Sequence, residues 1–522
     1  MLEIATTVTS SAVSWMSAGF NIYGAYDLAG STSQRQIFDP RKAPTSPEET
    51  PFGKLPAYLS YRPIKQSDFF YASGDGRDAF QSAFAARASV DVSVGAFAGH
   101  VEASYGKQIA ESSQYSFTNI SFRDMLGNLV LSGLGDTTYL SDEFTAAVRA
   151  LPDRVAPENL DRFADFFQTF GAYFVSQITV GATLEYYVAV NQSTSQTAVE
   201  ISAKAEAEYK ALFVSGKASA EMSSDQRWQT YRQNKTAAIR IRGGGDRERA
   251  LLNQVDPKTL DSMTPGTVAN YQNWLKSIAD NPAVMDFRLT GIWEVCGTKR
   301  KTVEDAFREY GRMMRPLLHV ETRTVVMGGD TYTPAVFLGG TLVPVEGPQA
   351  PYSWGGYRLV VIDRRHPNAK GVRLSRLYNQ QSGAADKYPE VFDAMMRDLE
   401  GGGFLNDGHF IVLATYGMLN AYPPVPKVAR TLQESGAGGQ LATWLALAAR
   451  GTGTANITHD INYILVGITK SGPDAGVELL ATSKIGSGPR IPQTSRLNLY
   501  FYGVGPGRPY VLGEAERKAS LA

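Results

Sequence analysis

A change of pattern at Gly171 constrains the fold more than any other feature of this chain. On its amino-terminal side, phenylalanines recur at helical spacing, so one apolar face of a helix packs inward. These are Phe163, Phe166, Phe167 and Phe170. Gly171 ends this helix, where a left-handed cap favours glycine. The run FVSQITVGATLEYYVAV from Phe174 indicates a strand, and Gly181 marks a bend or a close approach of two backbones. The plainest interpretation is an ordinary helix-to-strand corner.

Length and composition limit the class of protein. A chain of 522 residues with 43% hydrophobic content can bury more than one core, so we expect about two or three domains. Its 51 basic and 51 acidic side chains balance, which argues against nucleic acid as a partner and against a global attraction to anionic lipid. The single cysteine, Cys296, excludes an intramolecular disulfide framework.

The amino terminus gives the expected location of the protein. Residues 1–20 carry Glu3 and no basic residue, and Ser and Thr dilute their apolar content, which argues against a cleaved secretory signal. No apolar stretch reaches the roughly 20 residues of a membrane-spanning helix. We therefore expect a soluble protein that is secreted or released without a cleaved signal peptide.

Two passages flank the corner and alternate apolar and polar residues with the period of a strand. The first passage covers residues 89–109 and shifts phase at Gly99, and the second passage covers residues 198–222 and shifts phase after Phe213. Each is long enough for two transmembrane strands of roughly 9 to 11 residues, with an apolar row toward lipid and a polar row toward the lumen. The apolar rows are Val90, Val92, Val94, Ala96, Ala98, Val101, Ala103 and Tyr105 in the first passage, and Val199, Ile201, Ala203, Ala205, Ala207, Tyr209, Ala211, Phe213, Val214, Ala218, Ala220 and Met222 in the second.

The composition of the second passage disagrees with its pattern. Residues 202–212, SAKAEAEYKAL, consist largely of Ala, Glu and Lys, which are strong helix formers, although their polarity alternates. A segment that is helical in a soluble form and a strand in a membrane form would reconcile the two signals. Ordinary antiparallel strands with one wet face remain the alternative for each passage.

The corner resembles the signature of the membrane attack complex/perforin (MACPF) family. The residues that carry the resemblance are Phe170, Gly171, Ala172, Tyr173 and Phe174, followed by Gly181 and Ala182. This family usually has Thr and His at the positions of Ala172 and Tyr173, and a second Gly at that of Ala182. The resemblance implies that the two passages correspond to the helical clusters that unfurl into transmembrane hairpins.

Other landmarks follow the order of that family. Residues 19–24, GFNIYG, resemble its glycine-punctuated opening strand. The glycines Gly243, Gly244 and Gly245 resemble a hinge after the second hairpin region, with a plain loop as the alternative. Residues 271–278 predict a short helix with Trp274 as its core anchor. A strand over 287–295 and a helix over 301–315 follow.

The last dozen residues of the chain lie outside this order, and we expect them to be disordered or helical.

The character of the sequence changes after Val320. Residues 321–350 are rich in Gly and Pro and predict a linker or an edge hairpin. Within residues 351–522, strands alternate with helices, which indicates a compact α/β or α+β unit of about 140 residues. Residues 356–363, 407–417 and 463–471 resemble the lectin-like domain named for the interleukin-like inducer of epithelial-to-mesenchymal transition, also called a GG domain. The resemblance implies glycan binding, with Trp354, Asn406, Asp407 and Tyr416 as the contacts to test, and core or turn positions as the alternative.

Catalytic signals are weak. The histidines His100, His319, His366, His409 and His459 are scattered, so no compact metal site is visible. The glycine-rich runs GTGTAN and GVGPGRP lack Rossmann or P-loop spacing. We therefore expect neither an enzyme nor a cofactor.

Together these signals predict an α+β chain. A MACPF fold, a bent antiparallel sheet flanked by helical clusters, covers residues 1–320, and a C-terminal α/β receptor-binding domain covers residues 351–522. The resemblance implies a pore-forming toxin of the bacterial insecticidal type. Its soluble monomer binds a glycan or glycoprotein receptor on the target-cell membrane, forms a homo-oligomeric ring and inserts two β-hairpins per subunit. A non-lytic surface-binding protein of the same family is the main alternative, and an enzyme with a lectin-like module ranks third.

Overall fold

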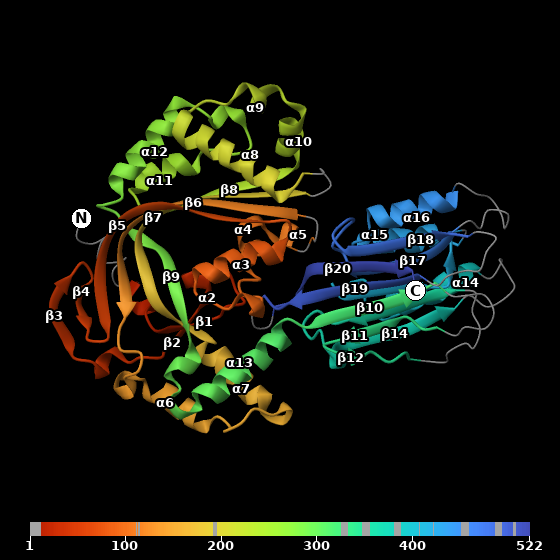
Figure 1. The fold of residues 1–522 in the computed structure, drawn as a ribbon, viewed down its shortest axis with the longest axis horizontal. Helices are drawn as coiled ribbons and strands as arrows, with labels where there is room; N and C mark the ends of the chain where they lie inside the picture. Colours follow the sequence, from red (N-terminus) through yellow and green to blue (C-terminus); the bar gives the residue numbers. More distant parts are fainter. Residues whose placement is uncertain are drawn as a thin grey trace. The chain divides into compact units, whose positions relative to one another are not determined.

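The computed structural model describes residues 12–110, 112, 115–191, 196–324, 332–346, 355–379, 388–406, 408–420, 422–449, 459–485, 493–504 and 508–521 (Figure 1). The chain forms two compact units. The first contains Met1–Lys107 and Tyr115–Arg312, and the second contains Gln108–Gln114 and Met313–Ala522. Helices and antiparallel sheets occur in both, so the predicted α+β class is confirmed.

The first unit is built on a strongly bent, seven-stranded antiparallel sheet. Its strand order is β2-β1-β7-β6-β5, and β8 and β9 both pair with β7. The strands are β1 (Ala18–Phe20), β2 (Thr32–Gln36), β5 (Leu59–Gly74), β6 (Tyr115–Leu131), β7 (Tyr173–Asn191), β8 (Lys235–Arg242) and β9 (Ala283–Gly291). The hairpin of β3 (Thr45–Thr50) and β4 (Gly53–Pro56) forms a separate two-stranded sheet. Figure 1 shows the long strands β5, β6 and β7 curving together.

The strand β7 changes partner at its bend. Its first half pairs with β9 as far as Gly181, and its second half pairs with β8 from Thr183 onward. At Gly181, where φ is +154°, a Cβ atom would lie 1.9 Å from the carbonyl oxygen of Asp124 in β6. No side chain fits there, so the predicted close approach of two backbones is confirmed.

Helices of the first unit follow the predicted landmarks with corrected ends. The helix α7 (Leu160–Phe170) buries its four phenylalanines, as predicted. Gly171 has φ +79° and ψ 152°, so it lies outside the left-handed helical region and the predicted cap geometry is wrong. The helix α12 (Pro265–Ser277) begins earlier than expected because Thr264 caps it and Pro265 occupies its first turn. Trp274 is fully buried, as predicted.

The remaining boundaries are close to prediction. The strand β9 starts four residues before the predicted position and ends at Gly291, where 3-10 turns follow. The helix α13 (Arg300–Met314) ends before Pro316, as expected. Short helices α2 (Leu28–Ser31), α6 (Asp142–Ala150) and α11 (Asp246–Asn253) complete this part of the unit.

The second unit has three layers. One sheet has the order β12-β11-β10-β19-β20, and the other has the order β14-β13-β15-β17-β16 with β18 paired to β17. The first contains β10 (Leu317–Arg323), β11 (Ala335–Leu338), β12 (Thr341–Leu342), β19 (Gln493–Tyr502) and β20 (Val511–Leu521). The second contains β13 (Gly356–Ile362), β14 (Val372–Asn379), β15 (Phe410–Tyr416), β16 (Met418–Leu419), β17 (His459–Ile468) and β18 (Val477–Lys484). Helices α14 (Tyr388–Gly401), α15 (Pro426–Glu434) and α16 (Gly439–Ala449) cover the outer face of this second sheet (Figure 1).

Burial on both faces explains the apolar strands of the second unit. In β13, Leu359 and Val361 pack beneath the helices, whereas Val360 and Ile362 pack against the five-stranded sheet. Such strands read as continuous apolar runs, which parallel α/β sheets also show. The pairing between the described strands is antiparallel, so this unit is α+β and the α/β alternative is wrong.

In the second unit, the end of the chain differs from the prediction, and the segment after Val320 has a more definite structure than the sequence indicates. The end of the chain forms β20 rather than a helix or a disordered tail, because β19 provides a pairing edge that local sequence cannot reveal. Residues 335–342 form the β11-β12 hairpin at the edge of the five-stranded sheet.

Candidate functional site: two helical passages on a bent sheet

The first passage is not a strand in this structure. It contains a 3-10 turn (Val92–Val94) and the helix α4 (His100–Tyr105), and it ends in the short helix α5 (Lys107–Ala110). Ser89, Gly95 and Phe97 have φ between 60° and 70°, a conformation that no regular strand contains. Most of its apolar row is buried, but Val92 is 50% exposed. The strand-like alternation therefore does not determine the conformation observed here.

The second passage is helical as well. It forms α8 (Ala198–Lys210), a π-helical turn (Ala211–Ser215) and α9 (Ala220–Ser224), and α10 (Gln226–Asn234) leads into β8. Thr197 and Glu200 make a capping box at the start of α8, and Gly216 ends the π-turn in the left-handed conformation. The helix-forming composition and these caps prevail over the alternation.

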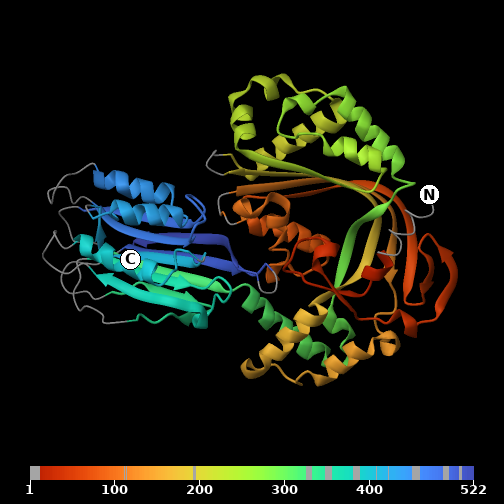
Figure 2. The ribbon, with the colours of Figure 1, turned by 180° about the vertical axis from the view of Figure 1, so that it is seen from behind.

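The two passages lie on opposite faces of the sheet. Tyr186 of β7 contacts Glu208 of α8, whereas the neighbouring Tyr187 lies 5.9 Å, between ring centroids, from His100 of α4. Figure 2 shows the same arrangement from behind, with α8 to α12 over one face and α3 (Arg77–Arg87) and α4 against the other. Coverage of both faces explains why nearly every residue of β7 is buried.

A fully buried ion pair holds α8 against the sheet. The Oε1 atom of Glu208 accepts a hydrogen bond of 2.5 Å from Nζ of Lys235, and neither side chain has exposed surface. Its Oε2 atom accepts hydrogen bonds from the hydroxyls of Tyr186 (2.7 Å) and Tyr231 (3.0 Å). Burial lowers the pKa of Lys235, and the negative charge of Glu208 acts in the opposite direction. Burial, reinforced by the charge of Glu208, raises the pKa of both tyrosines well above their ordinary value.

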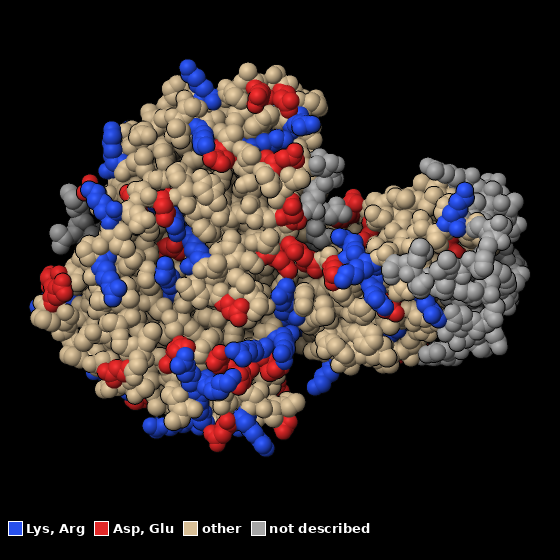
Figure 3. All heavy atoms as spheres, in the orientation of Figure 1, with Lys and Arg blue, Asp and Glu red and all other residues tan. Residues whose placement is uncertain are grey.

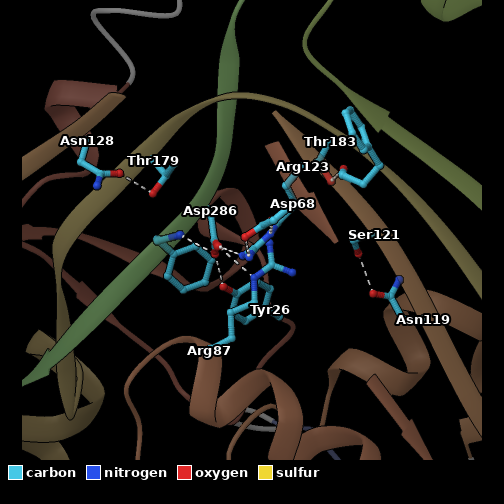
Figure 4. A network of polar contacts seen from close by, with 12 residues as sticks. Tyr26, Asp68, Arg87, Asn119, Ser121, Arg123, Asn128, Thr179, Thr183 and Asp286 are labelled. Atoms are coloured by element: carbon cyan, nitrogen blue, oxygen red, sulfur yellow. Dashed lines mark hydrogen bonds and ion pairs between the residues drawn. The ribbon is translucent and has the colours of Figure 1, made fainter. Parts of the chain in front are cut away.

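A second, partly buried network surrounds Asp286 of β9 (Figure 4). Its Oδ2 atom accepts hydrogen bonds from Nε of Arg87 in α3 (2.9 Å) and from Nη1 of Arg123 in β6 (3.2 Å). The Tyr26 hydroxyl donates to Oδ1, and burial followed by Asp286 raises the pKa of Tyr26 well above its ordinary value. Arg123 also binds both carboxylate oxygens of Asp68 in β5 at 2.6 Å. This network joins β5, β6 and β9 to the helix that precedes the first passage.

His100 occupies the centre of the first passage. It is 2% exposed, and its ring centroid lies 4.3 Å from that of Phe84. The Tyr26 amide donates to its Nδ1 atom at 3.3 Å, and Ser104 Oγ lies 3.4 Å from its Nε2 atom. Burial, reinforced by the positive charges of Arg240, Arg242 and Arg87, lowers the pKa of His100 to about 3. The imidazole is therefore neutral at pH 7.

The triple glycine is packed between the bend of β7 and α12. Gly243 and Gly244 have φ near +74°, and the Gly243 carbonyl accepts a 2.9 Å hydrogen bond from Nε1 of Trp274. A Cβ atom on Gly243 would lie 2.5 Å from the Gly181 carbonyl oxygen. The residues implied by the family signature are also packed, since Phe170, Gly171, Tyr173 and Phe174 are buried. Whether the glycines act as a hinge remains a prediction.

The proposed receptor contacts are not brought together among the described residues. Trp354 and Asp407 lie outside those residues, and Asn406 is exposed in the loop before β15. Tyr416 ends β15 with 4% exposure, which favours the alternative that it is a core residue. In the sequence, its position at the end of the apolar run FIVLATY already indicates that Tyr416 is a core residue.

The charged residues that organise the first unit are not apparent from sequence motifs. Glu208 belongs to the polar row of the second passage, and only its helical spacing from the buried Ile201 points to the core. Asp286, Arg87 and Arg123 are far apart in sequence and give no common signal.

Neither a membrane-spanning helix nor a cluster of metal ligands occurs in the described part of the chain. No helix there is long and apolar enough to cross a bilayer. No group of three or more His, Cys, Asp and Glu side chains in the same residues could hold a metal ion. Cys296 is buried, and burial raises the pKa of its thiol to about 12.

Comparison with known families identifies the fold. The model of the MAC/Perforin domain matches residues 9–316. The chain belongs to the MAC/Perforin domain family. The match contains the bent sheet and both passages, so the predicted MACPF fold is confirmed.

Solved structures with a similar arrangement are distant in sequence. GNIP1Aa from Chromobacterium piscinae is 15% identical, with 96% of this chain and 90% of that chain covered and a TM-score of 0.44. A Bacteroides thetaiotaomicron protein with a MAC/Perforin domain is 12% identical, with 65% and 71% covered and a TM-score of 0.37. The cytotoxin suilysin from Streptococcus suis is 8% identical, with 87% and 64% covered and a TM-score of 0.19. These likenesses add nothing to the family assignment. No curated protein sequence matches the chain.

Proposed function

We propose that this protein is a pore-forming toxin whose two helical passages become transmembrane β-hairpins. The observation that carries the proposal is the conflict in both passages between an alternating sequence and a helical fold inside a MAC/Perforin domain. Each passage has the length of two transmembrane strands, roughly 9 to 11 residues each.

The connectivity of the sheet supports this conversion. The first passage connects β5 to β6, and the second passage connects β7 to β8. Both strand pairs are antiparallel, and their pairing reaches the ends from which the passages leave, at Gly74 opposite Phe117 and at Val190 opposite Lys235. Straightening either passage would therefore extend an existing antiparallel pair in register with the sheet. A closed barrel of such hairpins satisfies every backbone group in lipid.

A ring of subunits would provide that closure. Among the described strands, β5 pairs only with β6 and β8 pairs only with β7, so each has an edge on which a second copy could add. A head-to-tail contact whose rotation closes gives a ring. The apolar rows are rich in alanine, so each strand gains little from lipid and a stable barrel needs many subunits.

The C-terminal unit is the proposed targeting module. We assign residues 351–522 to receptor recognition and residues 321–350 to a linker or edge hairpin that precedes it, and we expect a glycan or glycoprotein receptor because of the lectin-like resemblance. Many weak receptor contacts on one ring would add up to high avidity. Figure 3 shows both signs of charge interspersed over the first unit, so on the face in view no large region of one sign favours electrostatic capture by anionic lipid. A glycan array with the full chain, compared with a Trp354→Ala and Asn406→Ala variant, tests this part.

The insecticidal type rests on the two-domain build and the single cysteine, which resemble those of bacterial MACPF proteins. Insect midgut cells are therefore the first target to test for lysis, with mammalian cells as the comparison. The proposal includes no catalytic step, metal or cofactor.

A disulfide lock tests the conversion of the second passage. One cysteine is placed in α8 and one in β6, which pack together, at positions whose Cβ atoms lie within about 4.5 Å. The background variant Cys296→Ala removes the natural thiol. We expect the oxidised protein to bind membranes without releasing dye and the reduced form of the same protein to release it. Equal dye release from both forms would contradict the assignment.

A non-lytic surface-binding protein is the second candidate. The fully buried ion pair of Glu208 and the partly buried network around Asp286 favour it, because they stabilise the helical form. Negative-stain electron microscopy with target-cell membranes separates the two candidates. Rings that coincide with dye leakage support the pore, whereas tight binding without rings or leakage supports the non-lytic binder.

A further inference from the structure

The helical form of the second passage buries one side chain of the polar row and exposes several of the apolar row, and the three largest of these side chains are Glu208, Val199 and Val214. Glu208 belongs to the polar row but is fully buried, whereas Val199 and Val214 belong to the apolar row and are 79% and 62% exposed. In a strand with the observed alternation, Glu208 would lie with Glu200 and Glu206 on the wet face. Val199 would lie on the lipid face, and after the phase shift Val214 would too. The strand form relieves all three mismatches, so they favour the conversion proposed above.

The contacts of Glu208 bind α8 to three other elements. Its carboxylate accepts hydrogen bonds from Tyr186 in β7, Tyr231 in α10 and Lys235 at the start of β8. Lys235 donates a further 2.8 Å hydrogen bond to the Pro257 carbonyl. Both carboxylate oxygens and the ammonium are therefore satisfied while α8 remains docked. A partial displacement of α8 would leave two charges buried without each other.

The surroundings of this pair offer no substitute partner of comparable proximity among the described residues. Lys204 of α8 lies over the Tyr231 ring, with Nζ 5.5 Å from the centroid, and adds another positive charge nearby. Arg232 of α10 disfavours the charged form of Lys235, and Asp256 after α11 favours that form less than Glu208 does. Loss of the Glu208 carboxylate would therefore leave Lys235 largely uncompensated.

We propose that Glu208 is the latch of the second passage, whose ion pair with Lys235 keeps α8 helical on the sheet until the carboxylate moves directly into water. This inference rests on the proposed pore-forming function and adds the residue that sets the threshold for release of α8. The latch resists partial opening, because the pair is stable when fully docked or when both groups are hydrated. Release of α8 is consequently a single cooperative step.

Hydrogen–deuterium exchange of the full chain tests the latch without requiring a pore. Glu208→Gln keeps the shape of the side chain and removes its charge. We expect exchange over residues 198–215 to accelerate by about tenfold or more, with no change in the second unit. The matched control is Glu294→Gln, which removes a 2.7 Å ion pair with Arg300 outside both passages. Exchange in α8 that is equal in the two variants would overturn the latch.

A paired variant separates the latch from general misfolding. Glu208→Gln combined with Lys235→Met removes both charges, so we expect it to restore most of the protection of α8 that Glu208→Gln alone loses. Loss of protection throughout the first unit without recovery in the paired variant would overturn the proposal, because Glu208 would then be required for folding as a whole.

Dye leakage distinguishes failure of the latch from failure of the pore hypothesis. The full chain with a C-terminal histidine tag is captured on phosphatidylcholine vesicles that contain a nickel-chelating lipid and enclose calcein. Faster leakage with Glu208→Gln than with Glu294→Gln supports both ideas. Faster exchange without leakage from any variant supports the latch and counts against the pore.

Discussion

The two passages are held on the bent sheet by different physical means. The first passage packs a neutral His100 among Tyr26, Phe84 and Tyr187, and the hydrogen bonds of the His100 ring are long. The second passage buries the ion pair of Glu208 and Lys235. Aromatic packing weakens gradually as groups are removed, whereas a buried charge without its partner is strongly destabilising. We therefore expect acid to loosen the first passage and removal of a single charge to loosen the second.

Two substitutions share the largest expected effect, and the first is Lys235→Met, which leaves the Glu208 carboxylate buried without its counter-ion. The free energy of unfolding of the first unit should fall by about 3–5 kcal/mol. Urea unfolding followed by circular dichroism measures it. Lys210→Met is the matched control, because Lys210 is 63% exposed and pairs only at the surface with Glu206. A stability equal to that of the control would show that the buried pair does not hold the second passage.

Removal of an aromatic group tests the first passage in the same assay. Phe84 is fully buried and its ring contacts those of His100, Tyr26 and Phe80. Phe84→Ala should lower the free energy of unfolding by about 3–5 kcal/mol, because it removes these contacts and leaves a cavity. Phe69→Ala removes a ring that is 45% exposed and should have a clearly smaller effect. If the two variants unfold alike, aromatic packing is not what secures the first passage.

The sequence predicts the helices, strands and core anchors of the molecule better than it predicts which charged side chains contact each other. The stripe of α7, the Trp274 anchor and the strands of the second unit follow from periodicity and turn residues, which are local signals. The positive φ angles of Ser89 and Phe97 arise from tertiary packing, so the helical form of the first passage could not be read from its alternation.

Partner choice is the other part that the sequence does not reveal. Glu208 contacts Lys235 because β8 pairs with β7, which places Lys235 beneath α8. Asp286 contacts Arg87 because β9 belongs to the same sheet. For the same reason the sequence of the chain end does not predict β20, since its strand conformation depends on the edge of β19. Local sequence patterns determine helices and strands, whereas pairing between distant strands determines which charged side chains come into contact.

Acid should destabilise the first passage more than the second, and the loss of free energy should be smaller than that caused by Lys235→Met or Phe84→Ala. The pKa of His100 is about 3 in the folded protein, below its ordinary value of 6.5, so the folded form binds fewer protons than the released form between these values. The stabilisation is complete above pH 6.5 and is lost progressively as the pH falls toward 3. At pH 5 the loss is about 2 kcal/mol.

The comparison protein for this pH effect is His100→Gln, which does not titrate in this range and can accept the hydrogen bond from the Tyr26 amide. Hydrogen exchange over residues 89–110 at pH 7 and pH 5, corrected for the intrinsic pH dependence of exchange, should accelerate in the wild-type protein more than in the variant. The wild-type exchange over residues 198–215 should change less than that over residues 89–110. An identical pH response of the two proteins in residues 89–110 would exclude His100 as the origin of the effect.

The smallest effect on stability should accompany a large effect on function. Val199 is 79% exposed in α8, so Val199→Ser should change the free energy of unfolding by no more than about 0.5 kcal/mol. In the proposed barrel the same side chain faces lipid, where the loss of a buried valine costs about 1.5 kcal/mol or more in every subunit. Dye leakage should therefore fall although the soluble protein is unchanged. Leu251→Ser is the control, because Leu251 is 36% exposed on α11, outside both passages. Leakage that is reduced equally by both substitutions, or by neither, would place Val199 outside the inserted surface. Reduced leakage by Val199→Ser alone would separate the residues that stabilise the helical form from those that serve only the membrane form.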